Sequence, residues 1–355
     1  MPRTAPFDDS FSIGSKDIGS SKPTFIIAEI GSNHDQDLSQ AKQLIDVAAS
    51  AGADAVKFQT LDYDELFHDP TTDEQTAELY DEIELPTEWY PTLSEYVADQ
   101  GMAFLSSPTY PAAVDLLENI DVPAYKIASA QVVSDQQVIR QAASTGKPLF
   151  LSTGLGGMSH IEQSLQTCLD EKNSHVAVLH CVSEYPTEPA DAHLHRINRL
   201  SSAFGTICGF SDHTMSTYIP AAAVAMGAQI VEKHITLDRT LEGPDHETAL
   251  EPAEFKQMVN GIREVDAAVG HGVKLGATAD ESWLRDHVQL KLVTATDLSS
   301  GTRLSDQLMT SRRSPDGIPY ERLDELVEAG VTVKTDLSEG SLLRWAHLTG
   351  DETND

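Results

Sequence analysis

The sequence contains little cysteine and no long apolar run, and both absences narrow the class of protein. Its 355 residues include 3 cysteines, which stand too far apart for a disulfide framework or a Cys-x-x-Cys zinc site. No apolar run approaches the ~18 residues of a transmembrane helix, so we expect no membrane partner. The N-terminal residues lack the apolar core of a signal peptide, and we therefore expect a cytoplasmic protein.

Positive charge is also scarce. The chain has 24 Lys and Arg against 56 Asp and Glu, a formal net charge of −32. A polyanion of this size repels nucleic acid and anionic membranes, which argues against both as partners. Dense carboxylates keep a protein hydrated where salt screens their repulsion, so we predict a halophilic protein. An acidic mesophilic protein is the alternative, and a test of whether the chain unfolds at low salt separates the two.

Short apolar runs alternate with amphipathic segments, which is typical of βα units around a parallel sheet. The runs lie at 25–31, 55–59, 103–107, 124–129, 149–154, 176–183, 207–213 and 230–236. Helical patterns stand out at 38–51, 216–227 and 251–268. Together they predict a (β/α)8 TIM barrel. A doubly wound sheet is the alternative, but no Gly-x-Gly-x-x-Gly follows the first run.

The pattern changes near the C-terminus, where short strands and turns replace the βα units. We predict an N-terminal lead-in, a catalytic barrel, a linker, a small β-rich domain and a frayed tail at 1–24, 25–270, 271–288, 289–349 and 350–355. The motif Asp-Leu-Ser-x-Gly begins at both 297 and 336, a weak internal repeat. An acidic insertion at 61–85 is either a lid or a surface loop.

Two lysines lie inside apolar runs of the predicted barrel. Lys57 and Lys126 are expected near the carboxyl ends of their strands, where barrel active sites form. A buried lysine is costly unless it meets an anion. Five hydroxyls at the strand ends complete a predicted cradle for phosphate and carboxylate: Ser107, Ser129, Ser152, Ser183 and Ser211. The alternative is that each lysine pairs with a strand-end carboxylate such as Glu29.

Two histidines end the seventh and eighth predicted strands. His213 and His234 are therefore placed to share one divalent metal with open coordination positions. We expect Mn²⁺, with Mg²⁺ or Co²⁺ as alternatives. Asp245 follows the eighth strand and is interpreted as a ligand of a sugar hydroxyl or of a metal-bound water, or else as a turn residue. The residues thus predict a metal-assisted barrel enzyme that acts on an anionic, phosphorylated small molecule.

Several motifs resemble the sialic acid synthase family, which comprises the N-acetylneuraminate, legionaminate and pseudaminate synthases. They are Ile27-Ala-Glu-Ile-Gly-Ser-Asn-His, Tyr125-Lys-Ile-Ala-Ser, His180-Cys-Val-Ser-Glu-Tyr-Pro, Gly209-Phe-Ser-Asp-His-Thr and Glu232-Lys-His-Ile-Thr-Leu-Asp-Arg. The resemblance is collinear from about 13 to 348, and residues 289–349 resemble the family's antifreeze-like (SAF) domain.

The resemblance implies a reaction. The family condenses phosphoenolpyruvate (PEP) with an N-acylated mannosamine-type sugar and releases phosphate. Carbon 3 of PEP attacks the open-chain aldehyde, which the metal polarises. Water then adds at carbon 2, and phosphate leaves with its carbon–oxygen bond broken.

The resemblance also implies residue roles. The catalytic residues would be Glu29, Lys57, Lys126 and Gln131. The two lysines and the five serines would bind PEP, and the sugar would be bound by Gln59, Tyr185, Asp245 and Arg313. In the family the small domain reaches the partner subunit of a domain-swapped homodimer, which is how Arg313 would enter the site. Arg312 is the adjacent alternative.

Departures from the family pattern concern the sugar side. The family's Ile-Ala-Ser-Gly-Glu reads Ile127-Ala-Ser-Ala-Gln here, so Gln131 cannot take a proton or carry charge. The motif His180-Cys-Val-Ser-Glu-Tyr-Pro is more similar to the neuraminate and legionaminate branches than to the pseudaminate branch, so legionaminate specificity stands beside neuraminate specificity. A different PEP-dependent aldol-type synthase and a sugar-binding scaffold without activity are two further hypotheses.

Overall fold

The structure is a computed structural model that describes residues 6–68, 74–270, 272 and 274–349. The chain divides into two compact units, 1–271 and 272–355. The predicted tail lies outside the described residues. Within the described part, no helix is long and apolar enough to cross a membrane.

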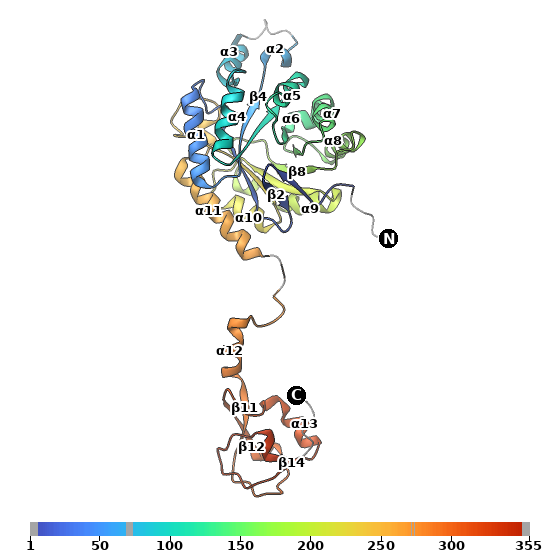
Figure 1. The fold of residues 1–355 in the computed structure, drawn as a ribbon, viewed down its shortest axis with the longest axis vertical. Helices are drawn as coiled ribbons and strands as arrows, with labels where there is room; N and C mark the ends of the chain where they lie inside the picture. The colour runs from blue at the N-terminus through green and yellow to red at the C-terminus, as the bar shows by residue number, and fades with distance from the viewer. Residues whose placement is uncertain (1–5, 69–73, 271, 273, 350–355) are drawn as a thin grey trace. The chain divides into compact units, whose positions relative to one another are not determined.

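The first unit is a closed parallel barrel, with helices around it (Figure 1). Its strands are β3 (Phe25–Glu29), β4 (Ala55–Thr60), β5 (Ala103–Pro108), β6 (Tyr125–Ile127), β7 (Leu149–Ser152), β8 (Val176–Cys181), β9 (Ile207–Asp212) and β10 (Ile230–His234). They follow one another in sequence order around the barrel, and β10 closes it against β3. The predicted (β/α)8 barrel is confirmed. Each predicted run overlaps one of its strands, and β4 and β5 extend one residue beyond their runs.

The helices pack their apolar faces on the outside of the sheet. They are α1 (Leu38–Ala51), α4 (Trp89–Asp99), α5 (Pro111–Glu118), α6 (Ser129–Ser134), α7 (Gln136–Ser144), α8 (Met158–Asp170), α9 (His195–Phe204), α10 (Ile219–Ala225) and α11 (Pro252–Val269). The predicted helix at 216–227 is shorter in the structure. The Ser216 hydroxyl accepts hydrogen bonds from the Tyr218 and Ile219 amides. This local turn takes the place of the first predicted helical residues, and the helix begins at Ile219.

A hairpin closes the amino-terminal end of the barrel. It consists of β1 (Ser10–Ile13) and β2 (Lys16–Gly19), and it lies in the predicted lead-in. Its buried side chains Phe11, Ile13 and Ile18 join the apolar cluster inside the barrel. The described part of 1–24 therefore belongs to the barrel unit.

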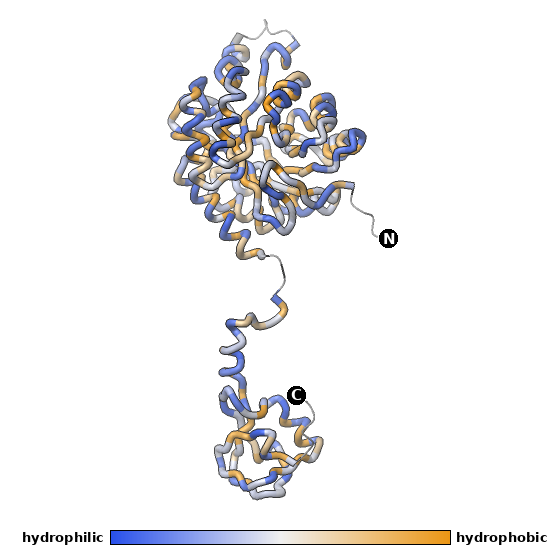
Figure 2. The backbone as a smooth tube through the Cα atoms, in the orientation of Figure 1, coloured by the Kyte–Doolittle hydropathy of each residue, from blue (hydrophilic) through white to orange (hydrophobic). Residues whose placement is uncertain are grey.

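The barrel interior has an apolar floor and a polar mouth. Inward-facing residues of the floor include Ile27, Ala55, Leu105, Phe150 and Ile230. Because side chains alternate along a strand, the next inward positions are two residues further on, and they are Glu29, Lys57, Ser107, Ser152 and Glu232. Figure 2 shows the barrel unit, whose hydrophobic segments run through its interior. The alternation of side chains along each strand therefore places the polar residues of the mouth in the layer next to the apolar floor.

The described part of the acidic insertion, 61–68 and 74–85, contains two helices, α2 (Tyr63–Leu66) and α3 (Glu74–Ile83). Tyr63, Phe67 and Tyr80 pack together, with ring centroids 4.6 to 5.5 Å apart. The Gln36 side chain, in the loop after β3, donates to the Glu82 carbonyl at 3.2 Å. The end of the insertion is therefore tied to a loop of the barrel mouth.

The second unit is built on short strands around a small apolar core. It contains α12 (Ala279–Val288), β11 (Leu290–Thr294), β12 (Met309–Arg313), α13 (Leu323–Glu328), β13 (Thr332–Val333) and β14 (Leu348–Thr349). Helix α12 lies in the predicted linker, has no buried residue, and exposes Trp283, Leu284 and Val288.

The two Asp-Leu-Ser-x-Gly motifs face each other in this unit. Leu298 and Leu337 exchange both backbone hydrogen bonds, each at 2.8 Å. The Asp297 carboxylate accepts from the Glu339 amide, and the Asp336 carboxylate accepts from the Ser300 amide, again at 2.8 Å. The weak sequence repeat is therefore a repeat in the structure.

Candidate active site

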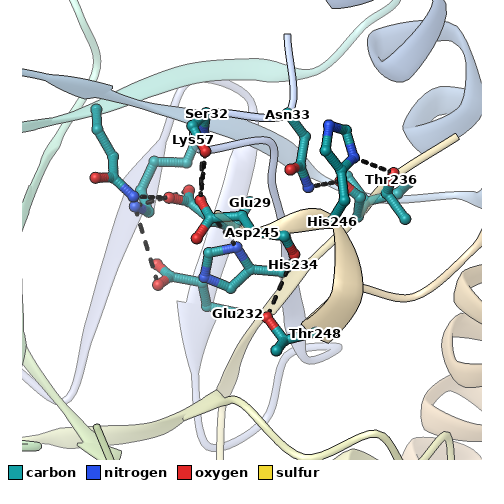
Figure 3. Close-up of polar contacts among 12 residues, drawn as sticks. Glu29, Ser32, Asn33, Lys57, Glu232, His234, Thr236, Asp245, His246 and Thr248 are labelled. Carbon is teal, nitrogen blue, oxygen red and sulfur yellow. Dashed lines mark hydrogen bonds and ion pairs between the residues drawn. The ribbon is translucent and has the colours of Figure 1, made fainter. Parts of the chain in front are cut away.

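Both predicted lysines are buried at the barrel mouth, and each meets a carboxylate. Figure 3 shows Lys57 with its carboxylate neighbours Glu29 and Glu232. Lys57 Nζ lies 2.7 Å from Glu29 Oε2 and donates to Ser107 Oγ at 3.1 Å. Lys126 Nζ lies 2.8 Å from Glu232 Oε1, which also accepts from Ser211 Oγ at 3.0 Å. The pairing of each lysine with a strand-end carboxylate, the alternative raised from the sequence, is what the structure shows.

The opposite charges in this cluster stabilise the ionised forms of Lys57 and Glu232. Burial alone would lower the pKa of Lys57, but Glu232 and Glu29 outweigh burial and raise it. Burial alone would raise the pKa of Glu232, but Lys126 and Lys57 hold it well below the ordinary value. Lys57 and Glu232 are therefore charged at neutral pH. An anionic ligand that approaches the lysines competes with carboxylates already in place.

Glu232 was not among the predicted site residues. It bridges the two lysines, because its Oε1 lies 2.8 Å from Lys126 Nζ and 4.0 Å from Lys57 Nζ. The sequence contained a usable signal, since Glu232 is the polar residue two positions before His234 on the same strand face.

The predicted serines lie at the same strand ends. Ser129 Oγ and Ser183 Oγ are 3.1 Å apart and share a hydrogen bond. The Ser152 hydroxyl is buried and has no hydrogen-bond partner among the described residues. A buried hydroxyl in this state needs a ligand or a water molecule to satisfy it.

The two predicted metal ligands are neighbours. The ring centroids of His213 and His234 are 5.5 Å apart. His213 Nδ1 lies 2.6 Å from the Val182 carbonyl, which can only accept, so Nδ1 carries the hydrogen and Nε2 keeps its lone pair. Burial and the neighbouring His234 lower the pKa of His213 to about 3, which keeps the imidazole neutral.

These residues fit a divalent metal with open positions. A neutral imidazole held through Nδ1 on a carbonyl is the usual arrangement of a metal-binding histidine. His234 Nδ1 is buried without a hydrogen-bond partner among the described residues, and it lies 3.9 Å from Asp245 Oδ2. Across 6–68, 74–270, 272 and 274–349, no cluster of three or more His, Cys, Asp or Glu forms a metal site. Protein ligands would therefore leave positions for water and substrate.

Three predicted sugar-side residues gather around the same mouth. Gln59 Nε2 donates to Glu29 Oε1 at 3.0 Å. Asp245 Oδ2 accepts from Ser32 Oγ at 3.0 Å, which ties the loop after β10 to the loop after β3 (Figure 3). The Tyr185 ring lies over His213, with centroids 4.0 Å apart, and remains half exposed.

The remaining predicted residues are less closely tied to this cluster. Gln131 is buried on α6, with Nε2 3.4 Å from the Thr109 carbonyl and Oε1 without a partner among the described residues. Arg313 is exposed on β12 of the second unit, and the adjacent Arg312 donates to the Ser311 carbonyl at 2.8 Å. The choice between the two arginines stays a prediction.

A second group at the mouth escaped the sequence prediction. The buried His246 ring places Nε2 2.7 Å from Asp35 Oδ1 and Nδ1 2.7 Å from Thr236 Oγ1. This group joins the loops after β3 and β10, as the contact between Ser32 and Asp245 does. The predicted barrel places these two loops next to each other, but nothing in the sequence indicated which of their side chains pair.

Comparison with known proteins decides the family. Residues 44–274 match the NeuB family, and residues 292–349 match the SAF domain. The chain belongs to the NeuB family. The N,N'-diacetyllegionaminic acid synthase of Campylobacter jejuni is 33% identical over 91% of this chain and 99% of that protein. The pseudaminic acid synthase of the same organism is also 33% identical, over 91% of this chain and 96% of that protein.

A solved NeuB-type structure agrees with the fold. The N-acetylneuraminic acid synthetase of Leptospira borgpetersenii, crystallised with citrate, is 35% identical and has a TM-score of 0.72. The match covers 78% of this chain and 95% of that chain. The predicted family is confirmed, as is the prediction of an enzyme, a transferase of the N-acetylneuraminate synthase type.

Proposed function

We propose that this NeuB-family enzyme condenses PEP with an N-acyl mannosamine-type sugar, and that the products are a nine-carbon 2-keto sugar acid and phosphate. The observation that carries the proposal is the burial of two lysines, Lys57 and Lys126, at a barrel mouth where the Ser152 hydroxyl has no hydrogen-bond partner among the described residues. Such a cradle suits a small molecule that carries both a carboxylate and a phosphate.

The donor side would act through fixed charge. Both lysines are already oriented by Glu29 and Glu232, so their ammonium groups need no reorganisation when PEP arrives. Lys57 and Lys126 then stabilise the negative charge that grows on the phosphate as the bond between carbon 2 and oxygen breaks. The hydroxyls of Ser107, Ser129, Ser152, Ser183 and Ser211 would supply the remaining donors.

The acceptor side would act through orientation. Gln59, Tyr185 and Asp245 would hold the sugar so that its aldehyde carbon meets carbon 3 of PEP. A divalent metal on His213 and His234, expected to be Mn²⁺ rather than Mg²⁺ or Co²⁺, would supply polarisation of the aldehyde when bound. Glu29 contacts both Lys57 and Gln59, at 2.7 and 3.0 Å, and in this proposal it would take the proton of the water that adds at carbon 2.

The acceptor sugar is the finer part of the proposal. The legionaminic and pseudaminic acid synthases of Campylobacter jejuni are equally similar to this chain, so overall identity favours neither acceptor. The SAF domain disfavours the remaining PEP-dependent aldol-type synthases. Gln131 keeps the size of the family's glutamate but offers an amide, which makes a scaffold without activity the main rival.

A phosphate-release assay tests the proposal. The protein would be given PEP and Mn²⁺ in concentrated KCl, as its predicted halophilic character requires. The acceptors are N-acetylmannosamine, its 6-phosphate and 2,4-diacetamido-2,4,6-trideoxymannose. We expect release with one of them, and its loss after chelation or in His213→Ala. Folded protein that binds sugar but releases no phosphate with any acceptor would support the inactive scaffold instead.

Gly154 provides a prediction for the PEP cradle. A Cβ at this position would lie 2.1 Å from Ser183 Oγ and 3.0 Å from Cys181 Sγ. Gly154→Ala should therefore displace Ser183 and raise the KM for PEP about 10- to 100-fold, the worth of a hydrogen bond to a charged group. Gly156→Ala is the matched control, because its Cβ meets no atom closer than 3.6 Å. Equal KM values for PEP in the two variants would mean that Ser183 does not bind PEP.

The domain-swapped homodimer has its own test. Helix α12 exposes Trp283, Leu284 and Val288, an apolar face suited to burial between two copies. His213→Ala and Arg313→Ala should each be inactive. Subunits exchanged between them should regain about a quarter of the wild-type activity, because half of the dimers carry one complete site. An inactive mixture that exchanges subunits would mean that Arg313 serves its own barrel. An Arg313→Ala variant that is active by itself would mean that Arg313 does not serve the site.

A further inference from the structure

A buried ion pair lies directly behind the two histidines. Lys233 Nζ is 2.6 Å from Asp212 Oδ2, and both side chains are 0% exposed. Register pairs Lys233 with Asp212 across β10 and β9, next to the pair formed by Glu232 and Ser211. Since alternate residues face opposite sides of a sheet, Asp212 and Lys233 point away from the mouth that their sequence neighbours line.

The contacts of this pair converge on the residue after His213. Asp212 Oδ1 accepts from the Thr214 amide at 2.9 Å, and Asp212 Oδ2 accepts from Thr214 Oγ1 at 3.1 Å. Lys233 Nζ donates to the Thr214 carbonyl as well as to Asp212. The turn that carries His213 is thereby fastened to the strand that carries His234.

Stability alone does not account for this arrangement. A buried ion pair often contributes no more to stability than two apolar side chains of similar volume, because removing two charges from water is costly. An apolar pair, however, could not hold the amide, hydroxyl and carbonyl of Thr214 in one geometry.

We propose that Asp212 and Lys233 are positioning residues that set the relative placement of His213 and His234, and through it the affinity for the divalent metal. This rests on the proposed metal site. The two residues touch neither substrate nor metal. They act through Thr214 and through the backbone of the adjacent strands.

The test is the double variant Asp212→Leu with Lys233→Met, which removes both charges at similar volume. We expect it to fold, with a lower melting temperature than the parent because the buried Thr214 loses its hydrogen-bond partners. Its Kd for Mn²⁺, measured by calorimetry on the metal-free protein, should rise about 10- to 100-fold, the usual effect of losing groups that orient metal ligands. The control is Asp17→Leu with Lys22→Met, an exposed pair at 2.8 Å, for which the Kd should not change.

A folded double variant that binds Mn²⁺ as tightly as the parent would overturn the proposal. If it does not fold, the replacement variant is Asp212→Asn, which keeps an oxygen acceptor for Thr214 but loses the charge that holds Lys233. Its Kd should rise about 2- to 10-fold, and an unchanged Kd would overturn the proposal.

Failure of the metal site itself gives a different result, namely a wild type whose Mn²⁺ binding is absent or insensitive to His213→Ala. Crystal structures of the metal-free proteins then decide the proposal. A ring separation of His213 and His234 that stays at the parental 5.5 Å in the double variant would refute it, and a changed separation would support it.

Discussion

Replacing Lys126 by methionine is expected to lower kcat/KM for phosphate release about 10²- to 10³-fold, the loss typical of removing one preorganised donor. The substitution removes a charge that the proposed reaction needs, and it leaves Glu232 with only Lys57, at 4.0 Å, as a cationic neighbour. The pKa of Glu232 should then rise, since Lys126 is the stronger of the two lysines that hold it down. Steady-state phosphate release against PEP concentration measures the effect.

The matched control is Lys147→Met, which removes a lysine that pairs with Glu118 and Asp121 on the surface. Its kcat/KM should stay at the wild-type value. The double variant Lys126→Met with Glu232→Gln also removes the Glu232 carboxylate, which has lost its close lysine partner. It should therefore be more stable than Lys126→Met but no more active. If kcat/KM of Lys126→Met stays within tenfold of the wild-type value, Lys126 does not take part in the reaction.

The second large effect concerns stability. Lys233→Met alone should lower the free energy of unfolding by about 3–5 kcal/mol, because it strands the Asp212 carboxylate in a fully buried position. Urea unfolding at constant high KCl measures this value. Lys22→Met breaks an exposed pair with Asp17 and should cost less than about 1 kcal/mol. If Lys233→Met lowers the free energy of unfolding by less than about 1 kcal/mol, the Asp212 carboxylate is protonated or reached by water.

The barrel and most of its mouth could be predicted because both follow from local periodicity. Each strand is a short apolar run, and the period of two carries inward positions such as Ile27 and Ala55 to Glu29 and Lys57. The hairpin that closes the barrel was harder to recognise. Its strands have four residues each, and only alternate positions such as Phe11 and Ile13 are apolar.

The partners of the polar residues could not be predicted, because they depend on which strands and loops meet. The sequence indicated buried cations at Lys57 and Lys126 but left open whether ligand or carboxylate would face them. It contained no sign that Asp35 would reach His246, more than two hundred positions away. Lys233 lies in a strand-end motif, where a charged residue is expected in the mouth rather than behind it.

The repeated motif of the second unit has a consequence for the symmetry of that unit. Asp297 serves the backbone of the copy around Glu339, and Asp336 serves the backbone of the copy around Ser300 in return. Such reciprocity is the mark of an isologous contact, the kind that two identical subunits make across a twofold axis. The second unit therefore has a pseudo-twofold relation within a single chain, centred on the pair formed by Leu298 and Leu337. Each copy of the motif holds the backbone of the other, so the loss of either carboxylate should loosen the turn that carries the opposite copy.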